Sequence, residues 1–230
     1  MGYKKSEIIK KLNEINKLED LYIGKMINYK GNTTDTKEKY TEVIAKEILD
    51  NPNKYNFNLI NIIKRDKGYN INTHDGKYNE ESPRREEIIA MKLFNTKHDG
   101  LGKFIDYQIP LKDKKNTKAG KIDLISYNEE ENILYLIELK NDFSKETLLR
   151  CILEIMTYIN QVDKEKLVLD YNMGSNVKIK PAILIFEGTR PHEDISDEYV
   201  TKLIKKFGIA LYIANIDEKF SIKRFNYEQS

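Results

Sequence analysis

The chain has 230 residues, of which 40% are hydrophobic and 33% charged, and its formal net charge is only +2. This is the composition of a soluble globular protein with one substantial core, and it argues against a strongly basic nucleic-acid coat protein. Cys151 is the only cysteine, so an intrachain disulfide is excluded and the cytoplasm is the expected location. The longest apolar runs, such as residues 182–186, are strand-sized, so no membrane partner is expected.

Residues 1–80 are predicted to form an N-terminal extension of helices and irregular chain. Apolar residues recur at helical spacing over residues 4–29, which predicts one helix, and residues 37–49 predict a second helix that ends before Pro52. Residues 53–80 are rich in Asn, Lys, Gly and Asp. This predicts mostly irregular structure, with a short helix near residues 57–63.

Residues 81–230 are predicted to form the core unit. Ser82 followed by Pro83 has the pattern of a helix N-cap and a first helical position, so a helix is expected from there to about Phe94. Further helices are predicted over residues 145–162 and 197–207. Strands are predicted over residues 104–109, 121–127, 133–140, 181–187, 209–216 and 220–225. This order predicts an α/β fold with a mixed central sheet flanked by helices.

Two of these strands carry charged residues inside apolar segments. If residues 129–132 form a hairpin turn, Asp123 lies opposite Glu138, and opposed residues point to the same face of the sheet. Lys140 shares that face because side chains alternate along a strand. Two opposed carboxylates need compensation, either from Lys140 or from a divalent cation that both hold. Hard oxygen ligands suit Mg²⁺ or Mn²⁺.

The pattern Asp123…Glu138-x-Lys140, with a Gly ahead of the Asp and a long helix after the Lys, resembles the PD-(D/E)XK nuclease superfamily. The resemblance covers roughly residues 83–187. It implies the restriction-endonuclease-like αβββαβ core of that family. Ile122 stands where the family's eponymous Pro would be, which is a common departure.

The resemblance also implies roles for individual residues. In that family the Asp and the Glu bind the metal, so Asp123 and Glu138 are the implied metal ligands, and Lys140 is the implied residue that orients or activates water. A Glu on the first core helix often completes the site. This implies Glu86 as a third metal ligand, preferred over Glu87 because three apolar residues share its helical face. Acidic residues in a first helical turn also complement the helix dipole, so a structural role stays open for both.

Two further groups of residues are candidates. Many family members carry a Gln and a Tyr on the helix after the Lys; here Tyr158 fits the Tyr, and Glu154 stands where the Gln is expected. A pair at i, i+4 on a helix is more often part of an interface or a salt-bridge face than of a site, so that reading stays open. A basic run precedes the Asp strand and is either a solvated loop or a contact with a phosphate backbone. Its members are Lys112, Lys114, Lys115, Lys118 and Lys121.

Other chemistries find little support in the sequence. His74, His98 and His192 lack metal-ligand spacing, so no zinc site is indicated. Cys151 falls in an apolar helix and is expected in the core. No glycine-rich loop has the spacing that cradles nucleotide phosphates.

The sequence therefore predicts a metal-dependent endonuclease that hydrolyses phosphodiester bonds with Mg²⁺ or Mn²⁺, as restriction, phage or defence enzymes do. DNA is the expected partner. Cleavage of two strands would favour a homodimer, although no sequence feature shows one. Three alternatives stay open: a catalytically weak or inactive nucleic-acid- or protein-binding module on the same fold, a ribonuclease effector, and an interaction protein whose resemblance to nucleases is accidental.

Overall fold

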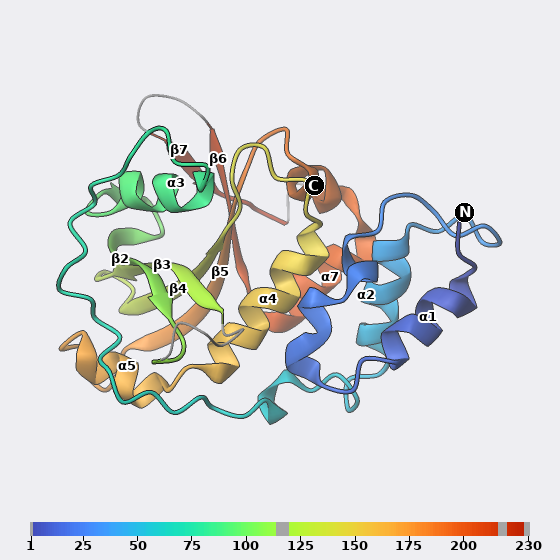
Figure 1. Cartoon of the computed structure of the whole chain (residues 1–230), viewed down its shortest axis with the longest axis horizontal. Helices are drawn as coiled ribbons and strands as arrows, with labels where there is room; N and C mark the ends of the chain where they lie inside the picture. Colours follow the sequence, from blue (N-terminus) through green and yellow to red (C-terminus); the bar gives the residue numbers. More distant parts are fainter. Residues whose placement is uncertain (1, 114–119, 216–219, 228–230) are drawn as a thin grey trace.

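A computed structural model describes residues 2–113, 120–215 and 220–227. Its centre is a seven-stranded mixed sheet in which the strands lie in sequence order (Figure 1). The β4–β5 and β5–β6 pairs are parallel, and the other pairs are antiparallel. The strands are β1 (Lys97–His98), β2 (Gly102–Pro110), β3 (Lys121–Asn128), β4 (Ile133–Leu139), β5 (Lys178–Phe186), β6 (Ala210–Asn215) and β7 (Ser221–Arg224).

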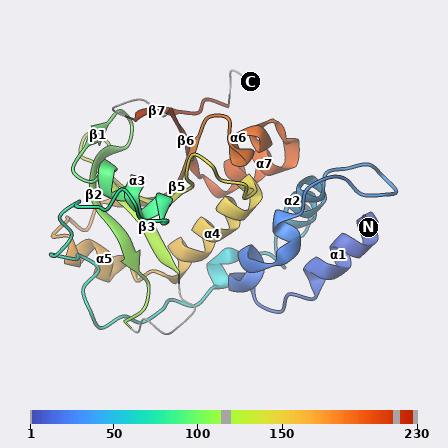
Figure 2. The same ribbon diagram turned by 45° about the horizontal axis from the view of Figure 1, so that its top comes forward.

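Helices cover both faces of this sheet, which explains why its central strands are apolar on both sides. Every residue of β4 is buried. Leu134 and Leu136 belong to the larger apolar cluster with helix α4, whereas Tyr135 and Ile137 belong to a second cluster with helix α3. Figure 2 shows α3 and α4 on opposite sides of the sheet. The expected mixed sheet flanked by helices is confirmed.

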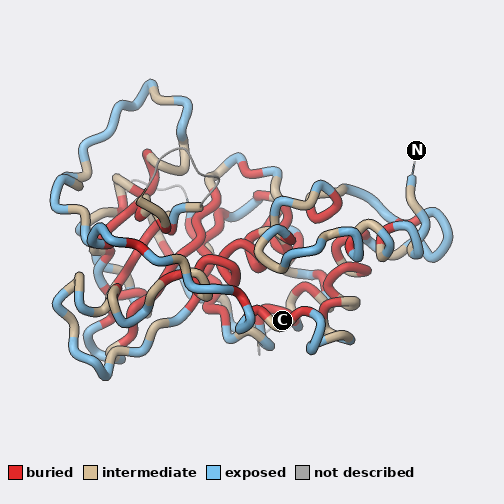
Figure 3. Tube along the Cα trace, turned by 60° about the horizontal axis from the view of Figure 1, so that its bottom comes forward, coloured by how far each residue is buried: buried red, intermediate tan, exposed pale blue. Residues whose placement is uncertain are grey.

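The helices of the core region lie between and after the strands. They are α3 (Arg85–Leu93), α4 (Leu148–Gln161), α5 (Lys164–Asp170), α6 (Arg190–Glu193) and α7 (Glu198–Phe207). Helix α4 is buried along most of its length, and Thr147 caps it by accepting a hydrogen bond from the Arg150 amide at 3.1 Å. Figure 3 shows buried residues concentrated in the sheet and α4, with the irregular segments at the surface.

Two predicted helix starts were wrong. Ser82 is not the N-cap of α3, because its hydroxyl accepts a hydrogen bond from the Arg84 amide at 3.3 Å and so closes a turn before the helix, which begins at Arg85. The helix expected from residue 145 begins at Leu148, where the Thr147 cap satisfies its first turn. Helices α5 and α6 and the two-residue strand β1 were not predicted.

The helix expected over residues 4–29 was also wrong, because the chain there forms α1 (Lys5–Asn13) and two 3₁₀ helices, Leu18–Ile23 and Lys25–Asn28. Gly24 joins the two 3₁₀ helices at a crowded point. A Cβ atom at Gly24 would lie 2.8 Å from the Ile15 side chain and 3.1 Å from the Leu21 carbonyl oxygen. The apolar periodicity therefore marks buried positions and not one continuous helix.

The rest of residues 1–80 adds helix α2 (Tyr40–Asp50), a 3₁₀ turn at Phe57–Leu59 and a long irregular segment. Apolar residues of α1 and α2, among them Leu12 and Ile44, belong to the same buried cluster as α4 and α7. The domain boundary expected at residue 80 stays a prediction. Across the residues that the structure describes, no helix is long and apolar enough to cross a membrane.

Candidate functional site

The β3–β4 hairpin has the predicted register. Asn128 pairs with Ile133, and the pairing continues to Leu124 opposite Ile137. Asp123 and Glu138 occupy the next position. There the Leu139 amide donates a hydrogen bond to Asp123 Oδ2 at 2.9 Å, which holds the carboxylate between the two strand ends.

A polar cavity of about 350 Å³ opens at this end of the hairpin. Its wall includes six of the residues that the sequence singled out for the site or its support. These are Glu86, Asp123, Glu138, Lys140, Glu154 and Tyr158. The structure therefore brings together residues from α3, β3, the end of β4, and α4, which are far apart in sequence.

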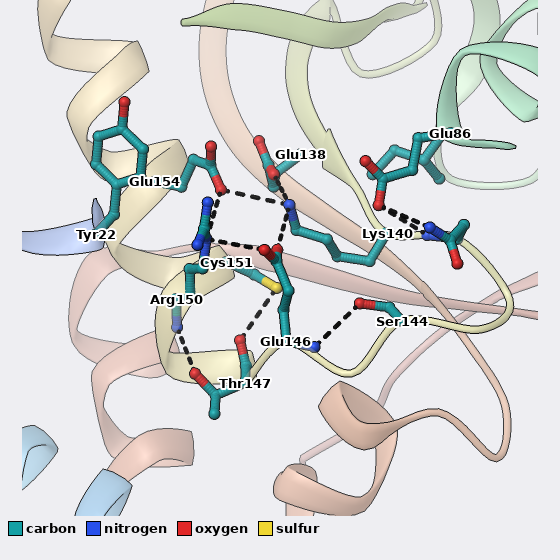
Figure 4. A network of polar contacts seen from close by, with 12 residues as sticks. Tyr22, Glu86, Glu138, Lys140, Ser144, Glu146, Thr147, Arg150, Cys151 and Glu154 are labelled. Atoms are coloured by element: carbon teal, nitrogen blue, oxygen red, sulfur yellow. Dashed lines mark hydrogen bonds and ion pairs between the residues drawn. The ribbon is translucent and has the colours of Figure 1, made fainter. Parts of the chain in front are cut away.

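Lys140 is the buried cation of this cavity. Its Nζ lies 2.5 Å from Glu138 Oε1, 2.9 Å from Glu146 Oε2 and 3.3 Å from Glu154 Oε2. Figure 4 shows the ammonium group surrounded by these carboxylates, with the Glu86 side chain set apart from them. Lys140 is only 5% exposed, so these contacts act at low effective dielectric.

Helix α4 supplies a ladder of polar groups along one stripe. Glu146 just before the helix, Arg150, Glu154 and Tyr158 follow each other at intervals of four residues, which places them on one helical face. Arg150 Nε lies 3.2 Å from Glu146 Oε1 and 3.6 Å from Glu154 Oε2, and the Tyr158 hydroxyl donates to Glu154 Oε1 at 2.8 Å. Sequence reasoning missed Glu146 and Arg150, although their spacing was a usable signal.

The four central charges respond differently to burial. Burial raises the pKa of Asp123 to about 7 and raises that of Glu138 well above its usual range, with repulsion from Glu154 adding to the effect on Glu138. Burial disfavours the charge on Lys140, but the surrounding carboxylates more than offset this and raise its pKa. Burial is also the largest single influence on Glu154, but Lys140, the hydrogen bonds from Glu138 and Tyr158, and Arg150 together outweigh it and lower the pKa of Glu154. The cavity thus holds one ammonium group that Glu146 and Glu154 pair with, and two buried carboxyl groups, Asp123 and Glu138, whose burial is not fully offset by nearby positive charge.

Gln108 positions Asp123 from the neighbouring strand. The β2–β3 register places Gln108 opposite Asp123, and Gln108 Nε2 donates to Asp123 Oδ1 at 3.0 Å. Gln108 has a φ of +50°, a conformation that is costly for a residue other than glycine and is found often at functional sites. Sequence reasoning missed this residue, although a polar side chain in a largely apolar strand was a usable signal.

The two glutamates at the start of α3 lie in different surroundings. Glu86 lies on the cavity wall and accepts hydrogen bonds from the Asn141 amide at 3.3 Å and from its side chain at 3.1 Å. Glu87 instead pairs with Arg84 at 3.2 Å and with Lys121 at 3.7 Å. Of the two glutamates, Glu86 is therefore the one that lines the cavity.

The N-terminal region also reaches the cavity. Tyr22 packs edge-on against Tyr158 with ring centroids 5.6 Å apart, and the two hydroxyl oxygens are 3.5 Å apart. A Cβ atom added to Gly120 would fall 2.1 Å from the Tyr158 ring. Tyr158 thus packs closely against both Tyr22 and Gly120. The contribution of Tyr22 had no signal in the sequence.

The predicted lysine run is only partly described. Lys114, Lys115 and Lys118 lie outside the described residues. Lys121 lies at the cavity mouth, and both Lys121 and Lys112 line an adjoining groove.

The residues of the cavity fit a divalent cation in chemistry and in charge. Carboxylate oxygens are the ligands that Mg²⁺ and Mn²⁺ prefer, and a cation would stabilise the charged forms of Asp123 and Glu138, which burial and, to a lesser extent, neighbouring carboxylates disfavour. In the described ranges, no three His, Cys, Asp or Glu residues are already gathered closely enough to hold a metal ion. The Glu138 carboxylate is paired with Lys140 instead.

Comparisons with protein-family models, curated proteins and solved structures found no match for this chain.

Proposed function

We propose that the protein is a metal-dependent nuclease that hydrolyses phosphodiester bonds, with DNA as the expected substrate. The observation that carries the proposal is the convergence of Asp123, Glu138 and Lys140 in one polar cavity, with Glu86 on its wall. The restriction-endonuclease-like core is part of the proposal. In its support, α3, strands β2 to β4, α4 and β5 follow each other in the order of that core, interrupted by β1 and α5.

Asp123 and Glu138 are the residues that would hold the metal, with Glu86 as the third carboxylate. A bound Mg²⁺ or Mn²⁺ would polarise a phosphate oxygen and lower the pKa of a coordinated water. For Glu138 to serve, its carboxylate must turn from Lys140. Lys140 can tolerate this because Glu154 and Glu146 still hold its ammonium group.

Lys140 acts as a fixed positive charge in this proposal. Its carboxylate partners raise its pKa, so it stays protonated at neutral pH and is a poor general base. A protonated Lys140 can donate a hydrogen bond to the attacking water and stabilise the negative charge that develops on the phosphate. Glu154 keeps the ammonium group in position, and Tyr158 in turn holds Glu154.

The test is a cleavage assay on double-stranded DNA, single-stranded DNA and RNA across a titration of Mg²⁺ and Mn²⁺. We expect cleavage that EDTA stops and that Asp123→Asn, Glu138→Gln and Lys140→Met each abolish. The control is Glu165→Gln, which changes an exposed acid on α5. Cleavage that survives all three site substitutions would refute the proposed site. Cleavage of RNA alone would favour a ribonuclease, and nucleic-acid binding without any cleavage would favour a binding module.

A further inference from the structure

A second, larger groove adjoins the polar cavity that contains Asp123, Glu138 and Lys140, which we call the acidic cavity. Its volume is about 760 Å³, and it shares Gly120 and Lys121 with the cavity wall, so the two hollows are adjacent. We refer to it as the basic groove because five cationic residues and one acid line it. The cations are Arg65, Lys67, Arg84, Lys112 and Lys121, and the acid is Asp113.

The acid of the basic groove is already neutralised. Asp113 accepts hydrogen bonds from the backbone amides of Asp66 at 2.8 Å and Lys67 at 3.1 Å, and it lies 3.5 Å from Arg65. In the described parts of the chain, neither Lys67 nor Lys112 forms a salt bridge. The groove therefore keeps positive charge available for a negatively charged ligand.

One wall of the groove is an irregular segment, residues 65–73, that is held in place by buried polar contacts. Arg65 is 7% exposed and donates to the Lys112 carbonyl at 2.8 Å and the Gly68 carbonyl at 3.0 Å, which joins the two walls. Tyr69 is fully buried, and its amide donates to Asp170 at 2.8 Å. The Ile71 amide donates to buried Asp106 at 3.3 Å. A long segment without secondary structure that is held this firmly is often functional.

Between these anchors the segment presents short polar side chains to the groove. Asn70, Asn72 and Thr73 are all exposed and line it. Amide and hydroxyl groups of this kind, together with Lys and Arg, are the usual partners of phosphate oxygens in nucleic-acid complexes. Figure 1 shows the segment passing α5 and continuing along the outer side of the sheet to α3.

We propose that the basic groove holds the phosphate backbone of a polynucleotide strand whose scissile bond lies in the acidic cavity, and that residues 65–73 form the substrate-binding wall. This inference rests on the proposed function, because only a nuclease would place the scissile bond of the bound strand in the acidic cavity. It assigns a role in substrate binding to part of the N-terminal region. Electrostatic contacts to the backbone carry no base information, so the groove contributes affinity and not sequence specificity.

The binding test uses the full-length protein in EDTA, so that no hydrolysis occurs. Fluorescence anisotropy of a labelled 12-nucleotide single strand, its duplex and the matching RNA is followed from 50 to 300 mM salt. We expect the double variant Lys67→Gln, Lys112→Gln to weaken binding about tenfold at low salt and to reduce the salt slope by about 1.5, because two phosphate contacts are lost. The control double variant Lys10→Gln, Lys17→Gln, far from the groove on and after α1, should match the wild type.

The outcomes separate this inference from the proposed function. No polynucleotide binding by the wild type, an equal loss in the control variant, or equally strong binding of polyglutamate would each overturn the groove assignment. Hydrolysis is measured separately, on a polynucleotide and on bis(4-nitrophenyl) phosphate, which is too small to occupy the groove. The groove variant should lower polynucleotide hydrolysis far more than hydrolysis of the small diester, and equal losses would contradict the assignment. Binding without hydrolysis of either substrate would retain the groove and refute the nuclease.

Discussion

The acidic cavity and the basic groove meet at Gly120 and Lys121, but they hold their charges in opposite ways. In the cavity, Lys140 and its carboxylate partners are buried and paired with each other. In the groove, Lys67 is exposed and Lys112 half-buried, and their charges face solvent without a paired acid in the described chain. Buried pairs are little affected by salt, whereas exposed cations lose most of their effect when screened. The buried pairs of the cavity suit a catalytic site whose charges keep their positions, and the exposed cations of the groove suit reversible binding of a charged ligand.

The largest expected effect that tests this comparison comes from removing the buried cation of the cavity, Lys140. Lys140→Met should reduce activity about 10³-fold, because it removes positive charge from the site of developing negative charge. It should also destabilise the fold by about 3–5 kcal/mol, since Glu138 and Glu154 would be left buried with their main cation gone. Single-turnover kinetics and urea unfolding at pH 8 measure the two effects.

The matched control is Lys202→Met, which breaks the exposed pair with Glu198 on α7. An exposed pair of this kind contributes at most about 1 kcal/mol. If the two variants were equally stable, the claim that the cavity charges act as buried groups would be wrong.

A second substitution should increase stability instead of lowering it, and it tests the claim that the cavity carries surplus negative charge. Asp123 has a pKa raised from 3.8 to about 7 by burial, so the folded state binds its proton more tightly than the unfolded state does. Wild-type stability should therefore decrease through this group as the pH rises from 4 to 7. Asp123→Asn removes that dependence while it abolishes activity.

In EDTA, Asp123→Asn should be more stable than the wild type by about 4 kcal/mol at pH 8, because raising the pKa of Asp123 from 3.8 to about 7 disfavours its charged form by that amount. The difference should vanish near pH 4. Thermal unfolding followed by circular dichroism across this pH range measures it. A variant that is less stable than the wild type by the same amount at every pH would show that Asp123 serves the fold and not a ligand.

A smaller effect concerns the wall that the two hollows share. Gly120→Ala would place a methyl group 2.1 Å from the Tyr158 ring, so the ring, whose hydroxyl donates to Glu154, must shift. We expect a loss of about 1–3 kcal/mol from overpacking and a measurable loss of activity through Lys140. Gly68→Ala is the control for stability only, because its Cβ would have no heavy atom closer than 3.8 Å but Gly68 lines the basic groove. Equal effects of the two substitutions on Tm, or full activity of Gly120→Ala, would show that Tyr158 has no positioning role.

The sequence was sufficient to predict the β3–β4 hairpin but not the residues that pack around it. A four-residue turn at residues 129–132 determines the register of the hairpin, so the opposition of Asp123 and Glu138 could be predicted. The long helix after Lys140 could be predicted as well, because an apolar face with helical period is a strong signal.

The remaining features depend on tertiary contacts that no local pattern encodes. Gln108 has a positive φ and donates a hydrogen bond to Asp123 on the neighbouring strand. Tyr22 contacts Tyr158, although the two residues are 136 positions apart in sequence. The wall formed by residues 65–73 has no periodicity at all, and its order comes from buried partners such as Asp106 and Asp170. Local sequence reasoning predicts such a segment to be irregular, and it cannot tell a fixed wall from a loose loop.

The central claim is that Asp123 and Glu138 together bind a divalent cation in the acidic cavity, and Mn²⁺ binding measured by electron paramagnetic resonance tests it most directly. Titration of the wild type should show a saturable Mn²⁺ site that is lost in Asp123→Asn and in Glu138→Gln and is retained in Glu165→Gln. Mg²⁺ should compete for it. Binding that is equal in all four proteins, or no binding by the wild type at millimolar Mn²⁺, would contradict the claim.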